Sequence, residues 1–214
     1  MKTELARVLP ADIEKRSMEI ITAELGERPL AADTADIVKR VIHATADFDY
    51  ADSLVFSPGA AAAGVAALLA GATIVTDTNM ALAGVSRPAC EKLGAAARCF
   101  MAEPEIAEAA RKNGTTRAAA SMEYAARHLS GPLIFAVGNA PTALVRLCEL
   151  IGDGSLSPSL VIGVPVGFVN VVESKELLLS LDTPHIVARG RKGGSSVAAA
   201  ICNALLYRAS GRTL

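Results

Sequence analysis

The sequence predicts an α/β fold: a three-layer αβα sandwich in which helices cover both faces of a central parallel sheet of five or six strands. Three short runs after residue 130 are apolar at nearly every residue, and each ends at or near glycine before a helix-like segment; they begin at Ile134, Leu160 and His185. Strands buried on both faces are typical of parallel sheets. Alternation of such strands with helices indicates parallel strands joined by right-handed crossovers.

Length and composition favour a single domain that spans residues 1–214. The chain has 214 residues, 51% of them hydrophobic, which is enough for a sizeable core. A net charge of −1 predicts no nucleic-acid partner and no anionic membrane surface. The 4 cysteines have neither metal-ligand spacing nor a disulfide pattern, which favours a reducing, cytoplasmic location. Charges throughout residues 1–16 argue against a secretory signal.

Two helices are expected at the start of the chain. Pro10-Ala11-Asp12-Ile13 opens the first, which runs to about Gly26, and Thr34 begins the second. Helical spacing predicts an apolar face on each. These faces consist of Ile13, Ile20, Ile21 and Leu25 in the first helix, and of Ile37, Val41 and Ile42 in the second.

Strands and further helices then alternate. The strand candidates are Leu54–Ser57, Ala72–Thr76, Ala97–Met101, Leu133–Val137, Leu160–Val164 and His185–Ala188. The longest helices between and after them are expected at Arg117–Leu129, Thr142–Ile151 and Ser195–Arg208.

The stretch Ser53–Thr76 carries no charge and is long enough to span a bilayer. Ser57-Pro58-Gly59 and Ala70-Gly71-Ala72 nevertheless divide it into segments of globular length. Its alanine-rich centre is only weakly favourable for membrane insertion. We therefore predict a buried βαβ unit here and no membrane segment.

The junctions after the last three strands predict a ligand site. Glycine lets backbone N–H groups approach a ligand, helix N-termini favour anions, and such junctions gather at one edge of a parallel sheet. Arg189, Arg191 and Lys192 precede the turn Gly193-Gly194-Ser195-Ser196, and this arrangement suits carboxylates. The alternative is a solvated turn whose serine caps the helix. Walker A and G-x-G-x-x-G motifs are absent from the sequence, so a dinucleotide is not indicated.

The chain has 3 histidines. His128 is expected in the last turn of a helix, and His185 starts a strand at the end opposite the expected site, so both are interpreted as structural. His43 follows Arg40 by about one helical turn. Spacing alone makes a half-buried helical histidine more typical of packing than of catalysis.

An ordered set of tracts changes the interpretation of His43. The tracts are Ile13–Ser17, Val41–Tyr50, Val75–Met80, Gly114–Arg117, Gly138–Leu144, Gly163–Phe168 with Glu173–Glu176, and Arg189–Ser195. In this order they closely resemble the precorrin-8X methylmutases, which include the cobalt-precorrin-8 enzymes, and the resemblance covers nearly the whole chain. One departure is Gly59, where many relatives are expected to carry Asn.

The resemblance implies a flavodoxin-like fold, a homodimer and no dissociable cofactor. It implies an isomerase of cobalamin biosynthesis that moves a methyl group from C-11 to C-12 of a corrinoid tetrapyrrole, giving hydrogenobyrinate or, with cobalt, cobyrinate. His43 matches the catalytic histidine of the family. Ser17 and Arg40 match its substrate contacts, and Arg117 matches an active-site arginine.

The residue chemistry agrees with this assignment. A macrocycle with carboxylate arms needs local cations and helix N-termini, and Arg40, Arg117, Arg191, Lys192 and the Gly193-Gly194 turn are candidates to bind it. A methyl shift needs no metal or nucleophile of the protein, but protonation of a ring nitrogen favours it. An imidazole can give and regain a proton near neutral pH.

Two alternatives remain from the sequence. One is a corrinoid or tetrapyrrole carrier without catalysis, in which His43 only donates or accepts a hydrogen bond. The other is an α/β enzyme with a phosphate ligand, in which Gly138–Thr142 and Gly193–Ser196 cradle anions. The sequence also leaves open whether the substrate contains cobalt.

Overall fold

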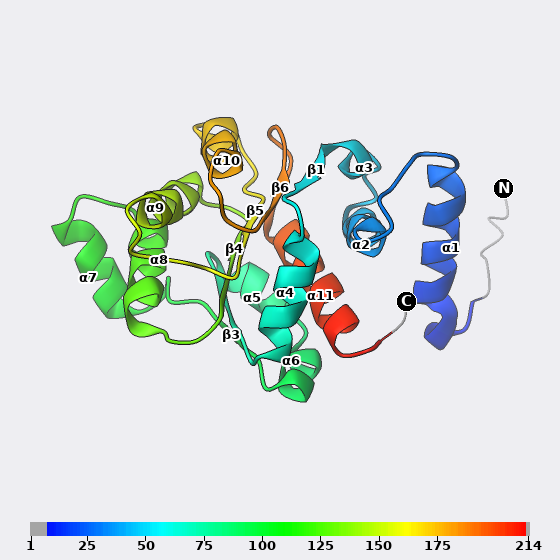
Figure 1. Cartoon of the computed structure of the whole chain (residues 1–214), viewed down its shortest axis with the longest axis horizontal. Coiled ribbons are helices and arrows are strands. Elements are labelled where there is room, and N and C mark those ends of the chain that lie inside the picture. The colour runs from blue at the N-terminus through cyan, green and yellow to red at the C-terminus, as the bar shows by residue number, and fades with distance from the viewer. Residues whose placement is uncertain (1–7, 213–214) are drawn as a thin grey trace, which may run out of the picture.

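The computed structural model describes residues 8–212 and contains a six-stranded sheet with strand order β1-β6-β5-β4-β2-β3 (Figure 1). The strands are β1 Leu54–Phe56, β2 Thr73–Thr76, β3 Ala96–Arg98, β4 Leu133–Val137, β5 Leu160–Gly163 and β6 His185–Ala188. The helices are η1 Pro10–Asp12, α1 Ile13–Leu25, α2 Ala35–Thr45, α3 Tyr50–Ser53, α4 Ala60–Leu69, α5 Asn79–Gly84, α6 Arg87–Leu93, α7 Pro104–Lys112, α8 Arg117–His128, α9 Pro141–Gly152, α10 Val171–Leu179 and α11 Ser195–Ala209.

Helices cover both faces of the sheet, as predicted, because alternate strand residues enter different cores. Ile134 and Ala136 of β4 pack with α2, α4 and α11 on one face. Phe135 and Val137 of the same strand pack with α8, α9 and α10 on the other. Every residue of β4, β5 and β6 is buried. The α/β sandwich with its mostly parallel sheet is therefore confirmed.

The direction of β1 corrects one prediction. β1 pairs antiparallel with β6, with Leu54 opposite Ala188, whereas the other neighbouring strands are parallel. β2 lies beyond β4, so β1, α4 and β2 do not form the βαβ unit predicted for Ser53–Thr76. An apolar run carries no information about strand direction, which depends on the neighbour that the strand meets. The start of β1 therefore lies beside the end of β6, where the backbone N–H of Arg189 donates to the carbonyl of Ser53 at 2.8 Å.

Helix α1 stands at one end of the molecule and packs on α2 (Figure 1). Its predicted apolar face is divided: Ile21 and Leu25 are buried, but Ile13 and Ile20 are 55% and 44% exposed. The prediction for α2 is confirmed, since Ile37, Val41 and Ile42 are all buried in the core.

The ends of β3 and the turn before α4 give two smaller findings. β3 is shorter than the predicted Ala97–Met101 strand and begins one residue earlier, at Ala96. Gly59 precedes α4 with φ of +73°, a left-handed conformation that asparagine also tolerates, so the departure at this position is compatible with the turn. None of the helices within residues 8–212 is long and apolar enough to cross a membrane.

Candidate active site

The turns after β4, β5 and β6 pack directly against one another at the carboxyl edge of the sheet. A Cβ atom added to Gly138 would lie 2.8 Å from the carbonyl oxygen of Gly194, and one added to Gly193 would lie 2.1 Å from that of Val164. The N–H of Gly194 donates to the carbonyl of Val164 at 2.9 Å. Glycine is thus required here because backbone meets backbone. Direct contact of Gly193 and Gly194 with a ligand stays a prediction.

Asp77, at the end of β2, occupies the N-terminus of α9. Its carboxylate is fully buried and accepts hydrogen bonds from the N–H groups of Gly138, Asn139 and Ala140 at 2.9, 2.8 and 2.7 Å. Burial raises the pKa of Asp77, and the three N–H donors oppose that rise only in part. The anion cradle considered at Gly138–Thr142 therefore already contains a carboxylate of the chain. Sequence reasoning missed this residue, although a carboxylate directly after a buried strand was a usable signal.

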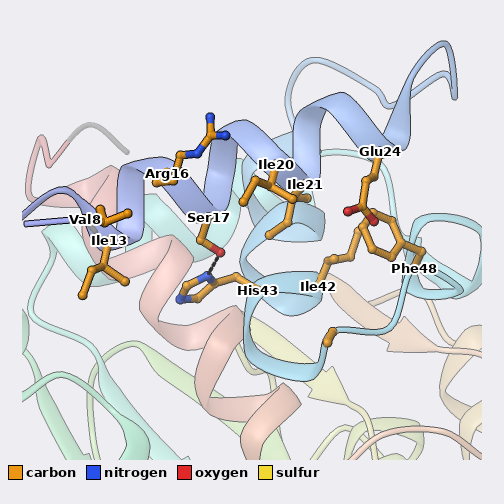
Figure 2. Close-up of a pocket in the computed structure, with 11 residues that line it drawn as sticks. Val8, Ile13, Arg16, Ser17, Ile20, Ile21, Glu24, Ile42, His43 and Phe48 are labelled. Atoms are coloured by element: carbon orange, nitrogen blue, oxygen red, sulfur yellow. Dashed lines mark hydrogen bonds between the residues drawn. The ribbon is translucent and has the colours of Figure 1, made fainter. Parts of the chain in front are cut away.

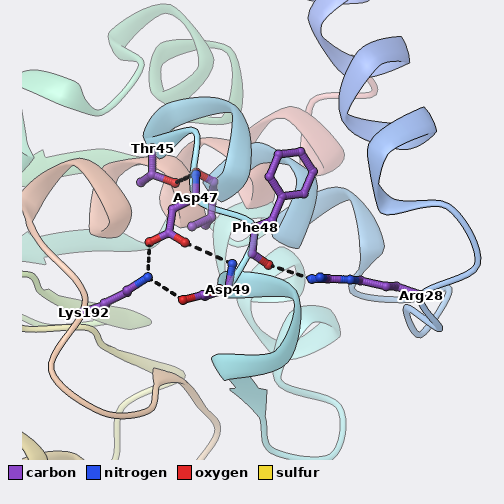
Figure 3. A network of polar contacts seen from close by, with 7 residues as sticks. Arg28, Thr45, Asp47, Phe48, Asp49 and Lys192 are labelled. Atoms are coloured by element: carbon purple, nitrogen blue, oxygen red, sulfur yellow. Dashed lines mark hydrogen bonds and ion pairs between the residues drawn. The ribbon is translucent and has the colours of Figure 1, made fainter.

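The cationic turn, residues 189–194, follows β6 and is tied to the loop after α2, residues 46–49. The ammonium of Lys192 lies 2.7 Å from a carboxylate oxygen of Asp47 and 2.6 Å from one of Asp49 (Figure 3). These hydrogen bonds raise the pKa of Lys192, and the bond from Lys192 helps to lower the pKa of Asp47. Lys192 thus already has two carboxylate partners within the chain. Its direct contact with a substrate carboxylate stays a prediction.

In the described part of the chain, Arg191 forms no ion pair with Asp47 or Asp49. Its guanidinium lies 5.5 Å from the centroid of the Phe168 ring, in the loop after β5. Phe168 is 81% exposed, and Arg191 is exposed as well. This cation and ring at the carboxyl edge can meet a carboxylate and an apolar ring surface of a ligand.

Ser17 and His43 meet in a cleft between α1 and α2. Ser17 Oγ lies 2.8 Å from His43 Nδ1 (Figure 2). The cleft has a volume of about 630 Å³ and is lined by Val8, Ile13, Arg16, Ser17, Ile20, Ile21, Glu24, Ile42, His43, Ala46 and Phe48. His43 is exposed to it, not half-buried as expected. An apolar cleft with a few converging polar groups is typical of a small-molecule site.

Arg40 does not open into this cleft. It is 7% exposed, its guanidinium donates to Glu14 at 2.5 Å, and it lies 5.1 Å from the centroid of the Tyr207 ring. Burial alone would raise the pKa of Glu14, but the hydrogen bond and charge of Arg40, with the charge of Arg212, leave it lowered. Arg40 therefore joins α2 to α1 and α11, and its contact with substrate stays a prediction.

Arg117 lies far from the cleft within one chain. It is the first residue of α8 and is exposed, next to Thr116, whose hydroxyl lies 2.8 Å from that of Thr142. Helix α8 packs on the face of the sheet opposite α2 and lies toward the other end of the long axis from α1 (Figure 1). A single copy therefore does not bring Arg117 together with Ser17 and His43.

The other histidines lie outside the cleft. His128 is in the last turn of α8, with Nδ1 2.9 Å from the carbonyl oxygen of Tyr124. Its imidazole stacks on the phenol ring of the same tyrosine. His185 is buried at the amino end of β6, with Nδ1 2.9 Å from the carbonyl of Thr183, and burial lowers its pKa. Within residues 8–212, no group of three or more His, Cys, Asp or Glu side chains is placed to hold a metal ion.

Comparison with known proteins identifies the family. The model of the family described as precorrin-8X methylmutase matches residues 12–208. The cobalt-precorrin-8 methylmutase of Priestia megaterium is 44% identical, over 92% of this chain and 88% of that protein. The precorrin-8X methylmutase of Pseudomonas aeruginosa is also 44% identical, over 90% of this chain and 93% of that protein.

A solved structure agrees with these relatives. The precorrin-8x methyl mutase from Thermus thermophilus superposes with a TM-score of 0.87 at 41% identity, over 95% of this chain and 98% of that one. Sequence, fold and near-complete coverage therefore confirm the resemblance, and the chain belongs to the precorrin-8X methylmutase family, the isomerases that move a methyl group in cobalamin biosynthesis.

Proposed function

We propose that this chain moves a methyl group from C-11 to C-12 of precorrin-8X or cobalt-precorrin-8, with His43 as the proton donor and acceptor. The products are hydrogenobyrinate and cobyrinate, respectively. The observation that supports this role for His43 most directly is its position: the imidazole is exposed to the α1–α2 cleft and Ser17 Oγ lies 2.8 Å from its Nδ1.

The hydrogen bond to Ser17 occupies one ring nitrogen and so orients the other. Among residues 8–212, Nε2 of His43 has no hydrogen-bond partner, which leaves it free to face a ring nitrogen of the corrinoid. A proton given to that nitrogen favours the tautomer from which the methyl group migrates with its bonding electron pair. The same nitrogen then returns the proton to His43, so that the step is neutral overall.

The rest of the cleft supplies a surface for the macrocycle. Ile13, Ile20, Ile42 and Phe48 give it an apolar lining. Such a surface can hold a conjugated ring in one orientation and limit the access of water. We propose that Arg117 and Arg191 bind carboxylate arms, because both are exposed and a guanidinium can pair with a carboxylate through two hydrogen bonds.

We further propose a homodimer that shares its sites between copies. Leu9, Ile13 and Ile20, on and just before α1, are 71%, 55% and 44% exposed, which is typical of a surface that another chain covers. Arg117 and His43 lie apart within a single copy, since α8 and α2 pack on different faces of the sheet and are well separated along the long axis (Figure 1). A two-fold arrangement would let Arg117 of one copy complete the cleft of the other.

Two further expectations belong to this proposal. Residues 1–214 act as one domain, in support of which both cores share one sheet. The protein acts in the cytoplasm: Cys90, Cys148 and Cys202 are buried free thiols, and burial raises the pKa of Cys148 and Cys202 to about 12. Cysteines that are free thiols and form no disulfide suit a reducing compartment.

The test is turnover of the precursor. Purified protein is incubated with precorrin-8X and, in parallel, with cobalt-precorrin-8, and the visible spectrum and mass are followed. The expected result is a new spectrum at unchanged mass, because the product is an isomer. Binding of either compound without conversion would contradict the proposal and favour a carrier. The substrate that is converted faster decides between the cobalt-free and cobalt-containing reactions.

A further inference from the structure

Lys175, in α10, is a fully buried lysine outside the proposed catalytic group. Its side chain is among the largest in the interior, at 0% exposure. Its Nζ atom donates to the carbonyl oxygens of Gly190 at 2.7 Å and of Lys192 at 2.8 Å. Within residues 8–212 it has no carboxylate partner. Both of its partners are in the cationic turn, residues 189–194.

Such a residue is costly for stability. Burial of an ammonium group without an opposite charge is unfavourable in general, and two carbonyl partners offset only part of that cost. An apolar side chain could fill the same space at lower cost. Packing alone therefore does not account for a lysine at this position. Its two hydrogen-bond partners, both in the cationic turn, indicate a role in shaping that turn.

The backbone of the cationic turn accepts hydrogen bonds at three successive carbonyl oxygens, those of residues 190, 191 and 192. Lys175 donates hydrogen bonds to the carbonyl oxygens of Gly190 and Lys192. The N–H of Gly167 donates to the carbonyl oxygen of Arg191, which lies between them in the chain, at 3.2 Å. These contacts fix the backbone that carries the Arg191 and Lys192 side chains. Both side chains are exposed.

The turn is connected in the other direction to the loop after His43. The Lys192 ammonium lies 2.7 Å from Asp47 and 2.6 Å from Asp49, and residues 46–49 directly follow α2 (Figure 3). Ala46 and Phe48 of that loop line the cleft that contains His43. A chain of contacts thus leads from Lys175 through the cationic turn to the wall of the proposed site.

We propose that Lys175 is a positioning residue, which holds the cationic turn in the shape that presents Arg191 to a substrate carboxylate. The inference rests on the proposed function, in which Arg191 binds the corrinoid. Lys175 itself is buried and touches no substrate. Its effect on binding passes through the backbone of Gly190 and Lys192.

The test is a double-substitution cycle measured by binding. Hydrogenobyrinate is titrated against the parental protein, Lys175→Met, Arg191→Ala and the combined variant. We expect Lys175→Met to raise Kd about tenfold, equivalent to about 1.4 kcal/mol. The combined variant should bind no more weakly than Arg191→Ala, because without Arg191 the shape of the turn no longer affects that contact. A merely structural role would change stability but would not produce this non-additivity.

A matched control is Lys92→Met. Lys92 also donates to a backbone carbonyl, that of Ser210 at 2.7 Å, but it is exposed on α6 and should leave Kd unchanged. Thermal unfolding checks that each variant is folded. If Lys175→Met does not fold, Lys175→Gln, which keeps amide donors, is tested for the same non-additive loss.

Three results separate the hypotheses. Parental affinity in a folded Lys175 variant would overturn the proposal, as would additive losses in the combined variant. A parental protein that binds hydrogenobyrinate but does not convert precorrin-8X would contradict the proposed function alone, because the Lys175 cycle is measured by binding.

Discussion

Ser17 Oγ and His43 Nδ1 lie 2.8 Å apart and join α1 to α2 through side chains that are 26 residues apart in the chain. Helix α1 stands at the end of the molecule (Figure 1), so this hydrogen bond both orients the imidazole and helps to place α1 over the cleft. The orientation of His43 therefore depends in part on the position of α1.

Replacement of His43 by Ala should severely reduce methyl migration and leave corrinoid binding largely intact. General acid–base catalysis typically contributes about 10²–10⁴ in rate, whereas binding is distributed over several cations and an apolar cleft. The measurement is single-turnover conversion followed by absorbance, with binding titrated separately. Ser17→Ala should have a smaller effect, because the hydroxyl orients the imidazole but is not the proton source. Conversion by His43→Ala at the parental rate would mean that this histidine only packs.

Loss of the exposed arginines should weaken corrinoid binding. Arg117→Ala, and Arg191→Ala with Lys192→Ala, remove charge-assisted hydrogen bonds, each of which typically changes affinity by about 10- to 150-fold. Since Lys192 is already paired with Asp47 and Asp49, Arg191 should account for most of the loss in the double variant. Titrations with hydrogenobyrinate at low and moderate salt measure the effect.

The control for these titrations is Arg111→Ala, on the exposed side of α7. Arg28 is a poor control, because its guanidinium contacts the carbonyl of Phe48 at 3.4 Å, in the loop that lines the cleft. Unchanged curves for Arg117→Ala and the double variant would place these cations outside the site.

Mixing of two defective variants tests the shared site. His43→Ala and Arg117→Ala proteins are refolded together and assayed at corrinoid concentrations well below Kd. If each site takes one of these residues from each copy, half of the sites in mixed dimers are intact, and roughly a quarter of the parental activity returns. If both residues of a site come from the same chain, the mixture will be no more active than the average of the two variants.

Asp77→Asn should destabilise the fold. The amide keeps one acceptor oxygen but places an N–H₂ group among the N–H groups of Gly138, Asn139 and Ala140. An unsatisfied buried polar group costs about 1–3 kcal/mol, so the urea midpoint should fall. Asp153→Asn is the matched control, since Asp153 accepts one backbone N–H, from Ser155 at 2.9 Å, on the exposed surface. Equal midpoints for both variants would mean that Asp77 does not hold the α9 turn.

Lys175 should make stability depend on pH on the alkaline side. Burial lowers its pKa from 10.5 to about 8 in the folded protein. Between these values the unfolded chain binds more protons, so the free energy of unfolding should rise as pH increases from about 8 toward 10.5. Lys175→Met removes this contribution, and the difference between parental and variant unfolding curves isolates it from other titrations. A difference that is constant with pH would contradict the lowered pKa.

The sequence by itself determined the elements and the edge at which the strands end. Periodic apolar residues are local signals, so the course of α2 and the complete burial of β4, β5 and β6 followed from them. The same patterns placed the glycine turns after these strands at one edge. The resemblance to the family was also carried by short local tracts, which is why it was confirmed without any knowledge of contacts.

Tertiary structure alone decided the direction of β1 and the partners of the charged groups. β1 pairs antiparallel with β6, and this pairing places the start of β1, with the loop after His43, beside the cationic turn. Asp77 meets a turn 61 residues later, and Lys192 meets Asp47 145 residues earlier. Such pairs depend on which distant segments the fold brings together, and no local periodicity encodes that. The sequence does not show whether a charged side chain pairs with a ligand or with another side chain. Only the folded chain determines which partner is within reach.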